Sequence, residues 1–122
     1  MTTPERLPFT FDVVFWKPWV ETVDELGADP EQTALLAEVV SSPRGRNYYA
    51  LLAHDAPALR ERTSLFNTIM HDELGVPRAD RELAAVAASR VNGCIYCASV
   101  HARRFAQFTK ERATVQRLLD EG

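Results

Sequence analysis

The chain has 122 residues, a length that suits one domain burying roughly two thirds of its unfolded surface, so we expect a single domain over residues 1–122. Its hydrophobic content of 46% and charged content of 25% are average for a globular protein, and its net charge of -3 gives no electrostatic reason to bind nucleic acid. No stretch approaches the roughly 18 apolar residues of a membrane span, and the N-terminus lacks the basic and apolar segments of a signal peptide, which predicts a cytoplasmic protein without a membrane partner.

The N-terminal third is predicted to contain an arm followed by two helices. Residues 1–15 mix proline, threonine and aromatic residues without a helical period, which is typical of an extended arm that docks on the domain. A short helix is predicted over residues 16–26, with an inward face of Trp19, Val20, Val23 and Leu26. Asp29 and Gln32 form a capping-box-like pair, so a second helix should span about residues 30–40.

The middle of the chain is predicted to form two further helices. Residues 41–45 contain serine, proline and glycine and should interrupt the helical pattern. Helical spacing of apolar residues returns over 47–54 and 57–74, and the Gly-Val-Pro sequence at 75–77 should end the second of these helices. The core candidates in this part are Leu59, Leu65, Phe66, Ile69 and Met70.

The C-terminal part is also predicted to be helical. Asp80 is the expected cap of an alanine-rich helix that ends at Asn92-Gly93, because glycine takes left-handed backbone angles at no steric cost. A new helix should begin at Cys94, and a final helix should cover about residues 109–119. No segment alternates convincingly in the manner of a strand, so the expected fold is an all-α compact helical bundle.

The cysteines carry the main functional signal. Cys94 and Cys97 are the only two in the chain and form a CxxC motif, and His101 lies four residues beyond the second. At 100° per residue, one helical face of core-facing width contains Cys94, Cys97, Ala98, His101, Phe105 and Phe108. The opposite face, expected to meet water, contains Arg103, Gln107 and Lys110.

These residue types suit thiol chemistry. The thiolate is the reactive form of cysteine, and the positive end of the helix dipole near Cys94 and Cys97 favours it. His101, one turn beyond Cys97, can accept the thiol proton directly or through a water. Glu82 can orient the imidazole if its helix folds back antiparallel, which predicts a carboxylate, imidazole and thiol proton relay.

Less specific interpretations remain open for each of these residues. A structural zinc module with Cys94, Cys97, His101 and Glu82 as ligands is the main alternative, although structural sites usually take their second ligand pair from a distant knuckle. In these interpretations Glu82 serves only the helix dipole, and His101 is a satisfied core histidine. The chain's other histidines, which have no cysteine nearby in sequence, are expected to be structural or exposed: His54 and His71.

The spacing of Glu82, Cys94-x-x-Cys97 and His101 resembles the active-site signature of alkylhydroperoxidase D-like proteins. These belong to the carboxymuconolactone decarboxylase superfamily. The similarity is strongest over residues 77–105, where the sequence also resembles members described as peroxidase-related.

This resemblance implies an all-helical fold and a cysteine peroxidase cycle that needs no metal, haem or other cofactor. One thiolate attacks a hydroperoxide, and the other thiol resolves the sulfenic acid as a disulfide. Because Cys97 and His101 are neighbours at i, i+4, Cys97 is the expected attacking thiol and Cys94 the resolving one, with the opposite order still open. The resemblance also implies a homo-oligomer and an unidentified thiol reductant or reductase. Phenylalanines along the approach, Phe105 and Phe108, would favour organic hydroperoxides.

Two departures from the family pattern bear on these expectations. Tyr96 stands where the best-known members have a histidine that joins the proton network, which predicts weaker peroxidase activity or a different substrate. Only 21 residues follow His101, whereas peroxidase-related members usually continue with several more helices, so we expect a chain truncated at its C-terminal end relative to them. A non-redox activity of the superfamily, such as lactone decarboxylation, is a further alternative, although such chemistry does not require two thiols.

Overall fold

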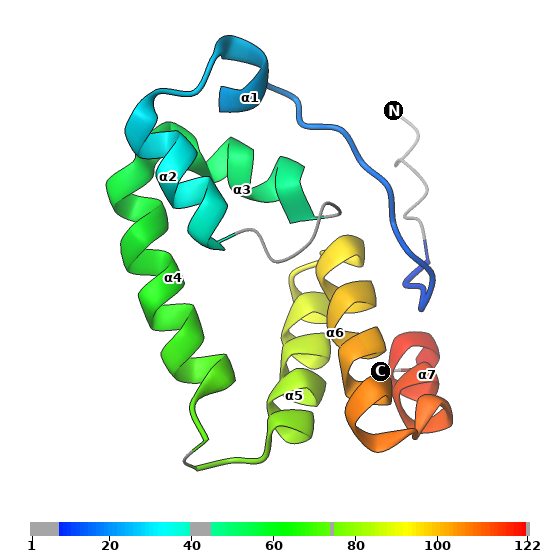
Figure 1. The fold of residues 1–122 in the computed structure, drawn as a ribbon. Helices are drawn as coiled ribbons and strands as arrows, with labels where there is room; N and C mark the ends of the chain where they lie inside the picture. Colours follow the sequence, from blue (N-terminus) through cyan, green and yellow to red (C-terminus); the bar gives the residue numbers. More distant parts are fainter. Residues whose placement is uncertain (1–7, 40–44, 74, 122) are drawn as a thin grey trace, which may run out of the picture. The chain divides into compact units, whose positions relative to one another are not determined.

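The computed structural model describes residues 8–39, 45–73 and 75–121. In these ranges the chain forms seven α-helices and one short 3-10 helix and contains no strand, which confirms the predicted all-α fold (Figure 1). None of the helices in the described ranges is both long and apolar enough to cross a membrane. The chain divides into two compact units, one comprising Trp16–His71 and the other Met1–Phe15 together with Asp72–Gly122.

The second of these units carries the CxxC motif. Its helices are α5 (Arg78–Val91), α6 (Ile95–Thr109) and α7 (Arg112–Glu121). Its buried core consists of side chains from all three helices: Val86, Ala98, Ala102, Phe105, Val115 and Leu119. Small alanine side chains on α6 allow the helices to pack closely around this core.

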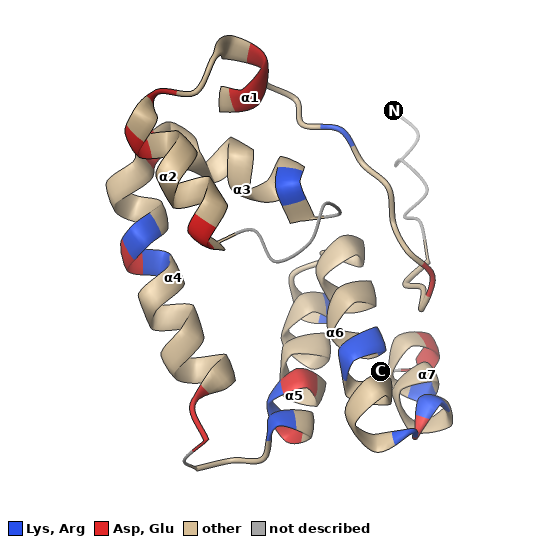
Figure 2. Cartoon of the chain, viewed as in Figure 1, with Lys and Arg blue, Asp and Glu red and all other residues tan. Residues whose placement is uncertain are grey.

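Helix α5 begins three residues earlier than the sequence predicted. Pro77 precedes the first turn in an extended conformation, and its carbonyl oxygen accepts the Arg81 backbone N–H at 3.1 Å. The predicted cap at Asp80 is therefore wrong, because Asp80 lies within the first turn, where its charge still complements the helix dipole. Charged residues of both signs gather in the first turns of α5 (Figure 2).

The turn between α5 and α6 has the form predicted from Asn92-Gly93. Gly93 adopts a left-handed φ of 71°. Its N–H donates to the Arg90 carbonyl at 3.0 Å, and the Cys94 N–H donates to the Ser89 carbonyl at 2.9 Å, which is the Schellman arrangement. These bonds satisfy the last carbonyls of α5 and send the chain back as α6.

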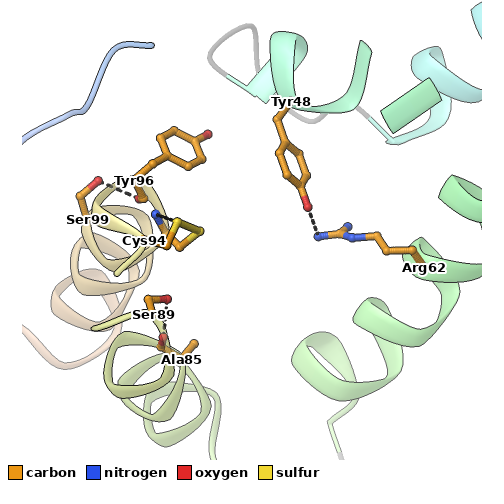
Figure 3. The surroundings of a disulfide bond; sticks show 8 residues. Tyr48, Arg62, Ala85, Ser89, Cys94, Tyr96 and Ser99 are labelled. Atoms are coloured by element: carbon orange, nitrogen blue, oxygen red, sulfur yellow. Dashed lines mark hydrogen bonds between the residues drawn. A yellow bond between two sulfur atoms is a disulfide. The ribbon is translucent and has the colours of Figure 1, made fainter. Parts of the chain in front are cut away.

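Cys94 is the N-cap of α6 rather than its first helical residue. Its Sγ accepts the backbone N–H of Cys97 at 3.2 Å (Figure 3). The predicted core-facing stripe is correct at Phe105 but wrong at Phe108, whose ring is 57% exposed because the last turn of α6 extends beyond the core. Arg103, expected in water, is half-buried and donates to the Asp12 carbonyl at 2.9 Å.

The end of α6 also differs from the prediction. Thr109, the expected start of the last helix, still belongs to α6. Lys110 then takes a left-handed φ of 64° and ends the helix, with its N–H donating to the Ala106 carbonyl at 2.9 Å. The final helix therefore begins only at Arg112.

The described part of the N-terminal arm, residues 8–15, is non-helical as predicted and docks on this same unit. Phe9 and Phe11 pack against the buried core. The guanidinium of Arg90 lies over the Phe9 ring at 5.0 Å, and that of Arg112 lies over the Phe11 ring at 4.2 Å. The earlier part of the predicted arm lies outside the described residues.

The Trp16–His71 unit consists of α1 (Val23–Leu26), α2 (Pro30–Val39), α3 (Arg46–Leu52), the 3-10 helix η2 (Ala53–Asp55) and α4 (Ala56–His71). It has its own buried core, formed by Val23, Leu35, Leu36, Val39, Ala50, Ala53, Ala56 and Leu59. The predicted break after α2 falls mostly outside the described residues.

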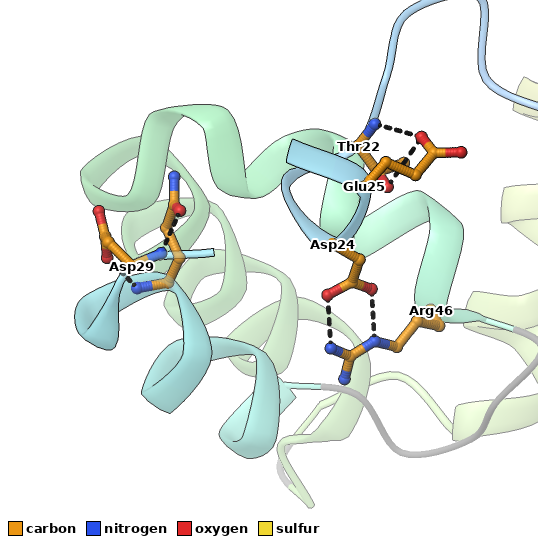
Figure 4. Close-up of polar contacts among 6 residues, drawn as sticks. Thr22, Asp24, Glu25, Asp29 and Arg46 are labelled. Carbon is orange, nitrogen blue, oxygen red and sulfur yellow. Dashed lines mark hydrogen bonds and ion pairs between the residues drawn. The ribbon is translucent and has the colours of Figure 1, made fainter. Parts of the chain in front are cut away.

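The helix predicted over residues 16–26 is wrong for most of its length. Only its last four residues are helical, and of its predicted inward side chains only Val23 is buried, whereas the others are exposed: Trp19, Val20 and Leu26. Pro18 disfavours helical angles in the residue before it. Thr22 then fixes the helix start, because its N–H donates to Glu25 Oε2 at 2.7 Å (Figure 4).

The predicted capping box at the start of α2 is confirmed. The Gln32 N–H donates to Asp29 Oδ1 at 2.8 Å, and the Asp29 N–H donates to Gln32 Oε1 at 3.0 Å (Figure 4). Nearby, the Arg46 guanidinium on α3 donates to both carboxylate oxygens of Asp24 on α1, each at 2.7 Å. These contacts fix the short helices of the unit.

The predicted core face of α4 is only partly correct. Leu59 and Met70 are buried and Phe66 is half-buried, but Leu65 and Ile69 are more than half exposed. The core of this unit takes its α4 side chains from the N-terminal end of that helix, whereas the helical spacing of apolar residues continues along the rest of it.

Candidate redox site

Glu82 and His101 meet across the packed pair α5 and α6. Glu82 Oε2 lies 2.6 Å from His101 Nδ1, and the Glu82 side chain is fully buried while that of His101 is 16% exposed. The Schellman turn directs α6 back along α5, which brings residues 19 positions apart into contact. The structure therefore joins two of the four residues that the sequence singled out, in the orientation that a proton relay requires.

Arg78 is a third member of this cluster, and the sequence reasoning missed it. Its Nε donates to Glu82 Oε1 at 2.7 Å, and a terminal nitrogen lies 2.5 Å from the same oxygen. The two residues are one turn apart on α5, and the i, i+4 spacing of opposite charges was the available signal. Glu82 thus uses one oxygen for Arg78 and the other for His101.

The Glu82 carboxyl stays ionised despite its burial. Desolvation on its own raises the pKa of this group, because a low dielectric disfavours the charged form. Hydrogen bonds from His101 and Arg78, and their positive charges, act in the opposite direction and outweigh it, so the pKa lies below the ordinary value. A buried carboxylate held in this state can stabilise a positive charge on the imidazole.

The two cysteines lie at disulfide-bonding distance. Their Sγ atoms are 2.21 Å apart and their Cα atoms 5.3 Å apart. Both side chains are partly exposed, and the Cys94 sulfur accepts the Cys97 N–H at the first turn of α6 (Figure 3). Cys97 and His101 lie one turn apart on this helix, so the imidazole is both anchored by Glu82 and close along the helix to the second thiol position.

Comparison with known proteins now bears on the identity of the chain. A family model described as the carboxymuconolactone decarboxylase family matches residues 56–121, which is more than half of the 122 residues. The chain belongs to the carboxymuconolactone decarboxylase family. No curated protein and no solved structure matches it significantly.

The matched segment of this carboxymuconolactone decarboxylase family member runs from the first residue of α4 to the last residue of α7. It contains Glu82, both cysteines and His101. The family includes decarboxylases and peroxidase-like enzymes as well as non-redox members, so membership by itself supports an enzyme of this superfamily without selecting its reaction. The redox signal comes from the CxxC pair of this particular member.

Tyr96, the residue where the family histidine was expected, lies between the two cysteines and is half-buried. Its main-chain carbonyl accepts the hydroxyl of the fully buried Ser99 at 3.0 Å (Figure 3). This bond fixes the backbone of the first turn of α6.

The remaining histidines make contacts of a structural kind in the Trp16–His71 unit. The His54 ring nitrogen Nε2 lies 2.8 Å from the Glu21 carbonyl oxygen. The His71 ring packs edge-on against Phe66, with ring centroids 5.8 Å apart.

The zinc alternative receives no support from the arrangement of possible ligands. In residues 8–39, 45–73 and 75–121, no three or more His, Cys, Asp or Glu side chains are grouped so that they could hold a metal ion.

Proposed function

We propose that this member of the family is a thiol-dependent peroxidase that reduces organic hydroperoxides. The observation that carries the proposal is the contact of 2.6 Å between Glu82 Oε2 and His101 Nδ1 on the helix that also bears the bonded Cys94–Cys97 pair. The imidazole supplies the base, the carboxylate orients it, and the two thiols supply a nucleophile and a resolving group.

The first step is activation of the attacking thiol. In the reduced protein His101 accepts the proton of Cys97, because Glu82 engages Nδ1 and leaves Nε2 as the ring nitrogen turned away from the carboxylate. The resulting imidazolium lies next to the buried Glu82 carboxylate, which offsets its charge. The charges of the thiolate and the carboxylate balance those of the imidazolium and Arg78. The ionised state therefore suits a partly buried site.

The second step is oxygen transfer and resolution. The Cys97 thiolate attacks the terminal oxygen of ROOH, the S–O bond forms, the O–O bond breaks, and the leaving alkoxide takes the proton from His101 to become ROH. The Cys94 thiol then attacks the sulfenic acid, which releases water and forms the disulfide. A dithiol reductant returns two electrons and two protons to restore both thiols. The opposite assignment of the two cysteines uses the same groups, and the Cys97 N–H bonded to Cys94 Sγ would then favour a thiolate at Cys94.

The expected preference for organic hydroperoxides depends on an approach lined by Phe105 and Phe108, as their positions on the helical wheel suggested. Phe105 belongs to the buried core and therefore does not line an approach to the thiols, while Phe108 is exposed near the far end of α6. Comparing turnover of cumene hydroperoxide with that of hydrogen peroxide tests this part of the proposal, and an equal or reversed preference would remove it.

The direct test is steady-state consumption of cumene hydroperoxide with dithiothreitol as reductant. Wild type is expected to turn over, and Cys94→Ser, Cys97→Ser and His101→Gln to lose at least about 100-fold, since each removes a reacting thiol or the base. His54→Gln is the matched control, because His54 contacts only a main-chain carbonyl in the Trp16–His71 unit and should retain wild-type turnover. Wild-type turnover in either cysteine variant would contradict the proposal.

The cycle also implies partners and a compartment. We infer an unidentified thiol reductant or reductase, since the disulfide must be reduced after every turnover. A reducing compartment such as the cytoplasm suits such a cycle. A homo-oligomer is part of the same proposal and rests on the family resemblance.

A further inference from the structure

We propose that Arg78 is a positioning residue, which holds Glu82 so that His101 donates through Nδ1 and presents Nε2 to the thiol. The inference rests on the proposed function for its catalytic consequence, but its physical content is the ionisation of Glu82 and the tautomer of His101. It assigns to the reaction a residue that takes no part in the chemical steps of the mechanism above.

The geometry of the carboxylate carries the inference. Two guanidinium nitrogens of Arg78 converge on Glu82 Oε1, at 2.7 and 2.5 Å, while Oε2 is 2.6 Å from His101 Nδ1. Both oxygens of a fully buried carboxylate are therefore engaged from opposite helices. Because the Arg78 contacts fix one oxygen, the other oxygen can point only toward His101, and it points there as an acceptor.

Of the two described residues that bind the Glu82 carboxylate, Arg78 carries the permanent positive charge. From its own helix Glu82 faces Arg78, and from α6 it faces His101, whose charge depends on its protonation. The charged residues of α7 are engaged elsewhere: Arg112 lies over the Phe11 ring, Arg117 pairs with Glu121, and Asp120 accepts a hydrogen bond from the Gln116 side chain. On α6, the Arg103 side chain donates to the main-chain oxygens of Phe11 and Asp12, which belong to the arm.

Arg78 is itself held in place. Its guanidinium lies over the Phe108 ring, with the central carbon 5.5 Å from the ring centroid, and its side chain is 21% exposed. This contact packs the exposed Phe108 against the same guanidinium that binds the Glu82 carboxylate. A lone ion pair on a helix surface would be screened by water, whereas a largely buried guanidinium acts on Glu82 at nearly full strength.

Removing the charge has a defined consequence. Without Arg78, Oε1 loses its donors in a buried setting, so the protonated form of Glu82 becomes more favourable and the pKa of the carboxyl rises. Protonation on Oε2 makes the carboxyl a donor to Nδ1 of His101, which leaves Nε2 as the protonated nitrogen of the neutral imidazole. In that tautomer the imidazole no longer takes the thiol proton through Nε2.

The experiment compares Arg78→Met, which keeps the aliphatic stem but removes the charge, with Arg78→Lys, which keeps the charge. Arg117→Gln is the matched control, because Arg117 also belongs to an i, i+4 ion pair but is exposed and on α7. In the reduced full-length chain, carboxyl carbon NMR follows Glu82 against pH, and long-range proton–nitrogen NMR reports the His101 tautomer. The pH profile of thiol alkylation by iodoacetamide is measured alongside.

In wild type and Arg117→Gln we expect the Nδ1–H tautomer in neutral His101 and an ionised Glu82 at neutral pH. Arg78→Met should move the Glu82 midpoint and the acid limb of alkylation to higher pH, populate the Nε2–H tautomer and slow alkylation about 10-fold at pH 7. Arg78→Lys should lie between the two. A folded Arg78→Met variant with the wild-type tautomer and the wild-type Glu82 midpoint would overturn the inference.

The experiment also decides the matter when Arg78→Met does not fold and when wild type lacks peroxidase turnover. If Arg78→Met does not fold, Arg78→Lys must still show a higher Glu82 midpoint than wild type, because an ammonium cannot reproduce two converging donors; an unchanged midpoint would overturn the inference. Since neither NMR nor alkylation uses a hydroperoxide, a wild type that lacks peroxidase turnover but shows these shifts would overturn the proposed function and support the positioning role.

Discussion

A buried carboxylate held between an arginine and a histidine is the feature on which the proposed chemistry depends. Glu82 has no exposed surface, yet its pKa lies below the ordinary value, because the hydrogen bonds from His101 and Arg78 outweigh the cost of burial. Such a group is stable only while its partners remain in place. Its ionisation therefore links the reactivity of the site to the stability of the fold.

The lowered pKa of Glu82 makes the free energy of unfolding depend on pH. A carboxyl with a lowered folded-state pKa stabilises the fold at pH values above its unfolded pKa of about 4.3, and the stabilisation is lost as the pH falls through the folded-state value. Replacing Glu82 by Gln should lower the free energy of unfolding by about 3 kcal/mol at pH 7, because Arg78 and His101 lose their counter-charge.

Urea unfolding of wild type and Glu82→Gln from pH 7 down to pH 3 measures this difference. The gap between the two proteins should narrow as the pH falls below about 4.3. Glu121→Gln is the control, since its partner Arg117 is exposed and the pair should contribute little. A gap that does not depend on pH would show that Glu82 does not act through its charge.

The pair of helices around the Asn92-Gly93 turn determines whether the relay exists at all. Glu82 and His101 lie on different helices, and the turn fixes the register between them. Gly93 has a φ of 71°, and a Cβ placed there would meet no atom within 4 Å. A substitution at this position therefore acts on the backbone conformation and not through a steric clash.

We expect Gly93→Ala to destabilise the protein by about 1 kcal/mol, because an L-residue pays a conformational cost in the left-handed region. The same strain should loosen the register between α5 and α6 and slow thiol alkylation at pH 7. Gly45→Ala is the matched control, since Gly45 has a φ of -87° and the new Cβ would make only ordinary contact with Tyr49. Thermal unfolding of both variants checks this, and equal losses would contradict the account of the turn.

Across the whole chain, the sequence predicted features that depend on short spacings and missed those that depend on tertiary partners. The Asp29 and Gln32 capping box and the turn at Gly93 are local chemistry, and both are present. Leu65 and Ile69 follow the helical period yet are more than half exposed, and the spacing of apolar residues alone does not reveal this exposure.

In the candidate site, too, the sequence predicted what depends on spacing and missed what depends on tertiary packing. The spacing of Glu82 and His101 indicated that they could meet, but only the packing of α5 against α6 shows that the pair closes through Nδ1. Arg78 had an i, i+4 signal that many exposed arginines share, and burial is what distinguishes it. The single-domain expectation stays a prediction, because the division into two compact units describes packing and not independent folding.

The most direct test of the central claim is a count of thiols in reduced, metal-free protein before and after one equivalent of cumene hydroperoxide. We predict that wild type loses two thiols and forms a Cys94–Cys97 disulfide, which mass spectrometry of the peptide containing both residues identifies. Cys94→Ser and Cys97→Ser should form no such disulfide, and the variant that keeps the attacking thiol should accumulate sulfenic acid, which identifies it. Thiols that do not react with the hydroperoxide, in a protein that instead binds stoichiometric zinc, would contradict the peroxidase account and support the structural metal site.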